Sequence, residues 1–195
     1  GDKDPFALRR HALGVIRILV EKDLPLDLSE LIAQAIPAFG EAIESPGLAL
    51  QDFFADRLAV NLREQGYSAQ EVDAVLALGL ARLGDVPKRL AAVRAFAALP
   101  EAASLAAANK RVGNILKKSD GVAAGAAVDA ARFVEDAERA LHTALTTVQP
   151  QADALFAQGD YTGSLKALAA LRTPVDAFFD TVMVNAENAA LRANR

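Results

Sequence analysis

The side chains best suited to binding chemistry gather in the stretch SLAAANKRVGNILKK, from Ser104 to Lys118. Lysine and arginine attract phosphate groups, the arginine fork can hold a phosphate through two hydrogen bonds, and asparagine amides can hydrogen-bond the edges of nucleobases. The stretch therefore indicates a contact with nucleic acid. The six candidate residues, which fall within ten positions of a chain otherwise rich in alanine and leucine, are Asn109, Lys110, Arg111, Asn114, Lys117 and Lys118.

A helical wheel separates this stretch into two sides. One side carries the residues expected to face the core, which are Leu105, Ala108, Val112, Ile115 and Leu116. The other side is polar and faces outward, with Lys110, Asn114, Lys117 and Lys118 on it and with Asn109 and Arg111 at its two borders. Lysines near a helix C-terminus also compensate the helix dipole, which explains Lys117 and Lys118 without a ligand. Dipole compensation leaves Lys110 and Arg111 unexplained.

Local charge supports an anionic partner more than the net charge of −4 does. Residues 82–118 hold eight basic and two acidic side chains, whereas the segments on either side are acidic. Lys88, Arg89 and Arg94 on the preceding predicted helix would extend the basic surface if the two helices pack antiparallel. Two alternatives remain open, because basic residues also gather by chance on solvated helix faces and a basic patch can dock an acidic protein.

Residues arranged for catalysis or metal binding are not evident in the sequence. The chain has no cysteine, and His11 and His142 stand on separate predicted helices without a second ligand at metal-binding spacing. No dinucleotide-binding, P-loop or nucleophile-elbow motif occurs. Glu135, Asp136 and Glu138 are interpreted as a solvated helix face. We therefore predict no catalytic residue, no metal ligand and no bound cofactor in this chain.

The pattern of apolar residues predicts an all-α fold, a bundle of roughly eight helices. Apolar residues recur at helical spacing, two-residue alternation is absent, and alanine and leucine outnumber β-branched residues. Asp27 or Ser29, the capping-box pair Ser68 and Glu71, and Gly66 mark predicted helix ends. Helices are expected over about 5–22, 28–39, 50–65, 68–84, 85–99, 100–118, 128–148, 162–171 and 175–187, with a loop over 119–127 and with Pro150 kinking or ending its helix.

The membrane is not an expected partner of this chain. No run of about 18 apolar residues lacks a charge, and the N-terminal GDKDPF has neither the basic nor the apolar region of a signal peptide.

Four stretches resemble, in order along the chain, the C-terminal part of the bacterial glycyl-tRNA synthetase beta subunit. ANKRVGNIL, from Ala108 to Leu116, is similar to the A-N-K-R-x-x-N-I motif of its helical, DALR-type anticodon-binding region. The other three stretches are DPFALRRHALGVIRIL, FFADRLAVNLREQGYSAQEVDAVLAL and FFDTVMVNAENAALRANR. The resemblance implies a helical segment from the body of the subunit over residues 1–84, followed by an anticodon-binding domain over residues 85–195.

The resemblance also implies a function that is divided between chains. In the family the alpha subunit activates glycine with ATP and Mg²⁺, the beta subunit recognises the tRNA, and the two form an α2β2 heterotetramer in the cytoplasm. This chain is then expected to be a C-terminal fragment that binds the anticodon arm of glycine tRNA and does not aminoacylate alone. The expected RNA contacts are Asn109, Lys110, Arg111, Asn114, Lys117, Lys118, Lys88 and Arg89. Phe178, Phe179 and Met183 have the spacing of a buried stripe and are expected in the core.

Overall fold

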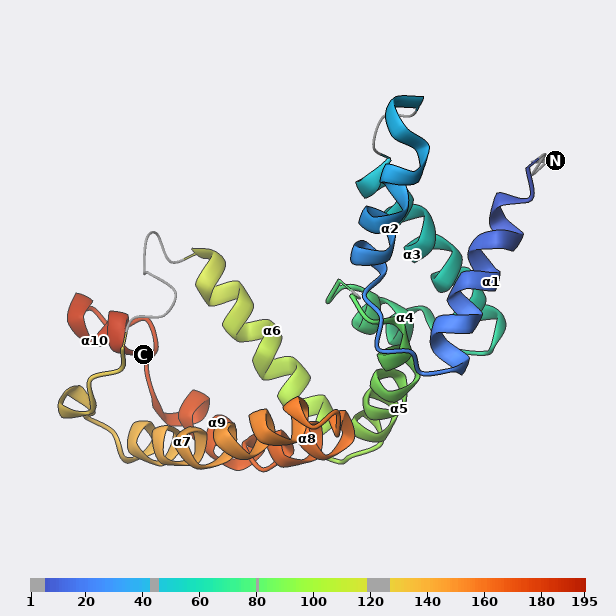
Figure 1. Cartoon of the computed structure of the whole chain (residues 1–195). Coiled ribbons are helices and arrows are strands. Elements are labelled where there is room, and N and C mark those ends of the chain that lie inside the picture. The colour runs from blue at the N-terminus through green and yellow to red at the C-terminus, as the bar shows by residue number, and fades with distance from the viewer. Residues whose placement is uncertain (1–5, 43–45, 80, 119–126) are drawn as a thin grey trace. The chain divides into compact units, whose positions relative to one another are not determined.

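The chain is all-α, as predicted, in the computed structural model, which describes residues 6–42, 46–79, 81–118 and 127–195 (Figure 1). Within these ranges the regular elements are α-helices and short 3-10 helices, with an isolated β-bridge between Asp27 and Arg82. The chain divides into two compact units, Gly1–Arg94 and Ala95–Arg195. The division at residue 85 that the resemblance implies stays a prediction.

The first unit packs its helices around an apolar core. Its elements are α1 (Leu8–Glu21), α2 (Leu28–Ala35), η1 (Ile36–Ala42), α3 (Gly47–Glu64), α4 (Ala69–Leu76), η2 (Leu83–Asp85) and most of α5 (Val86–Ala97). Ile16, Val72, Val75, Val86 and Leu90 are its most deeply buried side chains. Val86 and Leu90 thus tie the start of α5 to this core.

Local capping signals place several helix ends in the first unit where the sequence predicts them. The Asp27 carboxylate accepts hydrogen bonds from the backbone N–H groups of Ser29 and Glu30 at the start of α2. Ser68 and Glu71 form the predicted capping box of α4. Gly66, after α3, has a φ of 88°, which glycine adopts without strain. The helix expected to extend to residue 84 ends earlier, at Leu76.

Glu71 links the α4 cap to α5 and makes the stability of the first unit dependent on pH. Arg94 Nε donates to Glu71 Oε1 at 2.6 Å, and the Ser68 N–H donates to Glu71 Oε2 at 2.7 Å. First the Arg94 hydrogen bond and then the Ser68 N–H lower the pKa of Glu71 from 4.5 to about 2. A carboxylate with a lowered pKa stabilises the fold fully above its unfolded pKa, and this contribution is lost as the pH falls towards its folded pKa.

We therefore expect Glu71→Gln to weaken the acid sensitivity of the first unit. Between pH 6 and pH 3, circular dichroism in urea should show a smaller fall in the unfolding midpoint for Glu71→Gln than for the unchanged chain. Asp73→Asn is the matched control, because Asp73 is 72% exposed in its ion pair with Arg63. An equal fall for Glu71→Gln and the unchanged chain would show that Glu71 does not carry this sensitivity.

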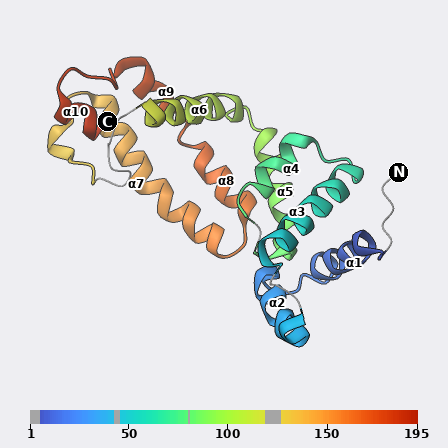
Figure 2. The same ribbon diagram turned by 90° about the horizontal axis from the view of Figure 1, so that it is seen from above.

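The second unit is built around its longest helix. Its elements are α6 (Ala102–Lys118), η3 (Ala130–Arg132), α7 (Asp136–Ala157), α8 (Tyr161–Ala169), α9 (Arg172–Thr181) and α10 (Ala189–Asn194). α8 and α9 pack against α7, and α9 also contacts α6. Figure 2 shows that α6 and α7 run in clearly different directions. Among the described elements of this unit, α9 makes the most extensive contact with α6.

Several helix boundaries in the second unit differ from the prediction, and α10 was not predicted. The helix expected from residue 128 begins at Asp136, after η3. Pro150 does not end this helix, which continues to Ala157. The helix expected over 175–187 ends at Thr181, because Val182 takes an extended conformation with φ −100° and ψ 124°. The loop expected over 119–127 lies, except for its last residue, outside the described residues, as does the expected helix start at residue 5.

No single helix in the described ranges is both long and apolar enough to cross a membrane, and only α5 and α6 taken together reach that length and composition.

Candidate nucleic-acid interface

The six candidate residues of the opening stretch are all exposed on α6. Within the described part of the chain, five of them form no ion pair, hydrogen bond or ring contact with another side chain, whereas the sixth, Arg111, contacts an aromatic ring. Unpaired cations and amides are available to a ligand. The five are Asn109, Lys110, Asn114, Lys117 and Lys118.

The apolar side of α6 is less covered than the wheel predicts. Leu105, Ala108 and Ile115 are half-buried, but Val112 is 40% and Leu116 is 59% exposed. The expectation that all five residues face the core is therefore wrong for Val112 and Leu116. The physical reason is that α6 packs chiefly against α9, which does not cover the whole apolar side.

Two contacts fix α6 against α9. Ser104 Oγ donates a hydrogen bond of 2.6 Å to Asp176 Oδ1. The other carboxylate oxygen of Asp176 forms an ion pair with Arg172. Farther along α6, the guanidinium carbon of Arg111 lies 4.2 Å from the centre of the Phe179 ring. This distance is within the range of a cation–π interaction. Arg111 is thus held at the α6–α9 junction although its side chain is exposed.

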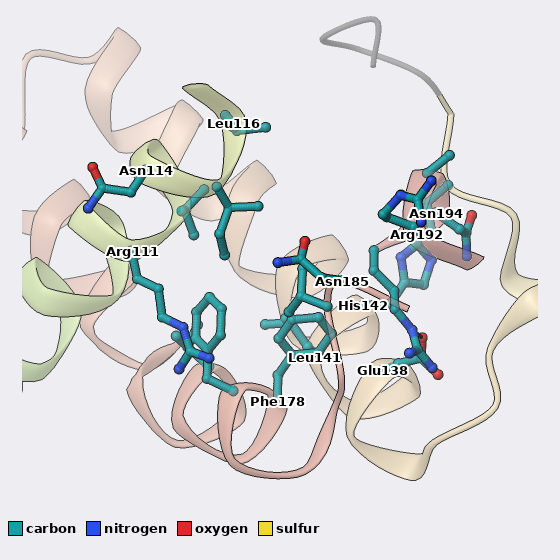
Figure 3. A pocket seen from close by; sticks show the side chains of 18 of the residues that line it. Arg111, Asn114, Leu116, Glu138, Leu141, His142, Phe178, Asn185, Arg192 and Asn194 are labelled. Atoms are coloured by element: carbon teal, nitrogen blue, oxygen red, sulfur yellow. Dashed lines mark hydrogen bonds and ion pairs between the residues drawn. The ribbon is translucent and has the colours of Figure 1, made fainter. Parts of the chain in front are cut away.

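A groove of about 1240 Å³ opens between α6 on one side and α7, α9 and α10 on the other. Figure 3 shows Arg111 pointing towards the aromatic side chains of α9, whereas Asn114 points away from them. The groove is lined by apolar side chains that include Val112, Ile115, Leu141, Leu145, Val175 and Phe178. Its polar lining includes Lys110, Arg111, Asn114, Lys118, Asn185 and Arg192. An apolar floor with cations and amides around it suits a ligand that has flat apolar faces and anionic groups.

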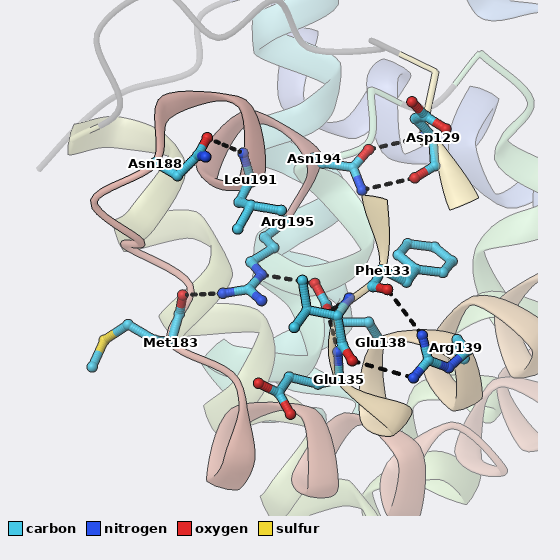
Figure 4. A network of polar contacts seen from close by, with 11 residues as sticks. Asp129, Phe133, Glu135, Glu138, Arg139, Met183, Asn188, Leu191, Asn194 and Arg195 are labelled. Atoms are coloured by element: carbon cyan, nitrogen blue, oxygen red, sulfur yellow. Dashed lines mark hydrogen bonds and ion pairs between the residues drawn. The ribbon is translucent and has the colours of Figure 1, made fainter. Parts of the chain in front are cut away.

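The closing residues of the chain hold the far wall of the groove in place (Figure 4). Arg195 Nε donates to Glu138 Oε1 at 2.7 Å, and both side chains are nearly inaccessible, with exposed fractions of 7% and 2%. Asn194 exchanges two hydrogen bonds with the backbone of Asp129. We call these two pairs the C-terminal clasp.

Glu138 is buried, which corrects its interpretation as part of a solvated helix face. Its second oxygen accepts hydrogen bonds from the N–H groups of Val134 and Glu135, at 2.8 and 2.7 Å. Burial raises the pKa of this carboxyl, but the Arg195 hydrogen bond and the two backbone N–H groups together hold the pKa below its usual value. Glu138 therefore serves as a charged anchor in the fold, at the start of α7.

Lys88 and Arg89, the two predicted contacts outside α6, belong to the first unit. Lys88 Nζ lies 2.9 Å from Asp23 Oδ2. The Lys88 hydrogen bond is the largest of the effects that lower the pKa of Asp23. The positive charge of Lys88 is thus partly balanced within its own unit. That Lys88 and Arg89 extend the basic surface of α6 stays a prediction.

Of the three residues expected in the core on or after α9, two are covered and one is not. Phe178 is buried and Phe179 is half-buried, with their ring centres 5.5 Å apart in an edge-on arrangement. Met183 is 71% exposed, so the core expectation is wrong for it. The helix ends before Met183, and the extended backbone at Val182 turns that side chain out of the apolar stripe.

The possible metal ligands of this chain are its two histidines and its carboxylates. Across the part of the chain that the structure describes, no three His, Asp or Glu side chains are placed to hold a metal ion. His142 packs against Phe133, with ring centres 5.3 Å apart. This is the environment of a partly packed structural histidine.

The sequence did not identify several groove residues on the far wall. Asn185, Arg192 and Asn194 stand in the closing stretch FFDTVMVNAENAALRANR, whose last eleven residues hold three asparagines and two arginines, a cluster of amides and cations that was a usable signal. Asn188, which accepts hydrogen bonds from the N–H groups of Ala190 and Leu191 at the start of α10, is a local signal for a short helix there. A cap places the helix but does not reveal which surface it faces.

Comparison with known proteins covers both units. The family model described as glycyl-tRNA synthetase beta subunit matches residues 1–77, and the DALR anticodon binding domain model matches residues 105–195. Glycine–tRNA ligase beta subunits of Leptothrix cholodnii, Delftia acidovorans and Paracidovorax citrulli are 76%, 67% and 68% identical to this chain over its whole length. The chain spans 27% to 28% of the length of these relatives.

Proposed function

Because the chain belongs to the glycyl-tRNA synthetase beta subunit family, we propose that its second unit binds the anticodon arm of glycine tRNA. One observation carries this proposal. Four of the exposed cations and amides of α6 line the groove within the residues that the anticodon-binding model matches, namely Lys110, Arg111, Asn114 and Lys118, whereas Asn109 and Lys117 are not among its lining residues. The unpaired bases of an RNA loop can enter such a groove while the adjoining phosphates remain at its rim.

The side chains of α6 divide between two roles in this proposal. Lys110, Lys117 and Lys118 attract phosphates, which strengthens binding to any RNA and makes it sensitive to salt. Asn109 and Asn114 can hydrogen-bond base edges or sugar groups. Arg111 belongs to neither class, because its guanidinium lies over the ring of Phe179 beside the groove. Selectivity for the anticodon would therefore come from the amides and the groove, and affinity from the lysines.

The aminoacylation reaction would require the remainder of the enzyme. We propose that the relevant assembly is the cytoplasmic heterotetramer of two alpha and two beta subunits, in which the alpha subunit uses ATP and Mg²⁺ to activate glycine. This chain would contribute tRNA recognition and no reacting group. Glycine, ATP and tRNA are expected to give no charged product with this chain alone.

Titration with two transcripts tests the proposal. One transcript is glycine tRNA, and the other differs from it only in its anticodon. We expect saturable binding of both, with the native anticodon bound more tightly, measured by fluorescence anisotropy at a fixed salt concentration of about 0.15 M. Equal affinity for both transcripts would contradict anticodon recognition. Binding of neither transcript would favour a basic surface that docks an acidic protein.

A further inference from the structure

The contact between Arg111 and Phe179 places the guanidinium of this arginine over an aromatic ring at the groove. The guanidinium lies over the ring at 4.2 Å from its centre, while Arg111 itself stays exposed. An arginine guanidinium is planar and weakly hydrated, so it can stack between two flat groups. Phe179 lies on one side of the guanidinium, and both residues line the groove.

Phe179 is itself held in place from behind. Its ring packs edge-on against the buried Phe178, and Ser104 with Asp176 ties α6 to the same helix. The position of Arg111 is therefore set by both α6 and α9. A fixed flat cation loses little conformational freedom when a ligand stacks on it.

Beside Arg111, the groove offers apolar surface for a base and a separate cation for a phosphate. Val112, Ile115 and Val175 supply apolar groove surface near this junction. Lys110, the residue before Arg111, is exposed and forms no side-chain hydrogen bond or ion pair within the described ranges, so it is available for a phosphate. A nucleotide placed here would have apolar surface and a flat cation for its base and an ammonium group for its phosphate.

We propose that Arg111 is a stacking platform for one unpaired base of the RNA loop, with Phe179 as the positioning residue that supports it from the opposite side. The base, the guanidinium and the phenyl ring then form three layers at the edge of the groove. This inference rests on the proposed RNA-binding function and assigns Arg111 to a base contact, where the sequence suggested a fork for phosphate.

The test uses an anticodon stem-loop hairpin in which 2-aminopurine replaces one loop base at a time, because the fluorescence of this base falls when it stacks. With the unchanged chain we expect quenching at one loop position. Arg111→Lys keeps the positive charge but removes the flat group, so it should abolish this quenching and weaken binding about tenfold. Phe179→Leu keeps an apolar side chain and should reduce the quenching, because the guanidinium loses its support.

A hairpin that lacks the base at the quenched position completes the comparison. The unchanged chain should bind this abasic hairpin about tenfold more weakly than the intact one, whereas Arg111→Lys should bind both about equally. Circular dichroism checks that each variant remains helical.

The outcomes separate this inference from the proposed function. Hairpin binding without quenching at any loop position, or quenching that Arg111→Lys preserves, would overturn the stacking role alone. Absence of hairpin binding by the unchanged chain would overturn the RNA-binding function and the stacking role together.

Discussion

Arg195→Ala is expected to lower the free energy of unfolding of the second unit by about 3 kcal/mol, because it leaves the Glu138 carboxylate buried without its cationic partner. The pair is 2.7 Å apart, and neither side chain is more than 7% exposed. The substitution also removes the hydrogen bond from Arg195 to the carbonyl oxygen of Met183. Hydrogen exchange measured by mass spectrometry should show faster exchange in the peptides of residues 127–139 and 182–195.

Arg172→Ala is the matched control for this prediction. It removes the same side chain from an ion pair in the same unit, but the partners, Arg172 and Asp176, are 46% and 42% exposed and 3.4 Å apart. An exposed pair of this kind contributes less than about 1 kcal/mol. Equal effects of the two substitutions would contradict the view that the C-terminal clasp stabilises the unit through its burial.

The combined substitution of Lys110, Lys117 and Lys118 by alanine is expected to weaken tRNA binding roughly 50-fold near physiological salt. Each lysine that contacts a phosphate displaces condensed counterions, so removing three should reduce the slope of log affinity against log salt by about 2 to 3. The loss should be similar for glycine tRNA and for the transcript with a different anticodon, since phosphates carry no sequence information. Titrations at several salt concentrations measure both effects.

A second triple variant removes the same charge from the first unit. Arg10, Arg17 and Lys22 are exposed on or directly after α1, and their replacement by alanine changes the net charge of the chain equally. Binding should change little if the α6 lysines contact the RNA directly. An equal loss in both triple variants would indicate that only the overall charge matters.

Several helix ends with local signals were predicted from the sequence, whereas burial that depends on distant contacts was not. Asp27, Ser68 with Glu71, and Gly66 mark helix ends through interactions within a few residues, and all three predictions are confirmed. The start of α7 was missed although its signal is local, because Glu138 Oε2 accepts hydrogen bonds from the N–H groups of Val134 and Glu135 directly before the helix. What depended on a distant contact is the burial of Glu138, since its partner Arg195 lies 57 positions farther along the chain. No pattern near Glu138 distinguishes a buried carboxylate from a solvated one.

For the candidate interface, too, the sequence predicted local features and missed contacts between helices. The helical wheel correctly places Lys110, Asn114, Lys117 and Lys118 on an exposed face, because helical geometry is local. It cannot tell whether a neighbouring element covers the opposite side, and so Val112 and Leu116 were expected in a core that does not enclose them. The contact between Arg111 and Phe179 joins two helices and likewise required the structure.

The measurement that tests the central claim most directly is a competition between two RNA hairpins taken from the same glycine tRNA. One is the anticodon stem-loop and the other is the acceptor-stem hairpin, and both are titrated against this chain at about 0.15 M salt. If the second unit recognises the anticodon arm, the stem-loop should displace labelled tRNA at a concentration at least about tenfold lower than the acceptor hairpin. Equal displacement by the two hairpins, or stronger displacement by the acceptor hairpin, would contradict the account.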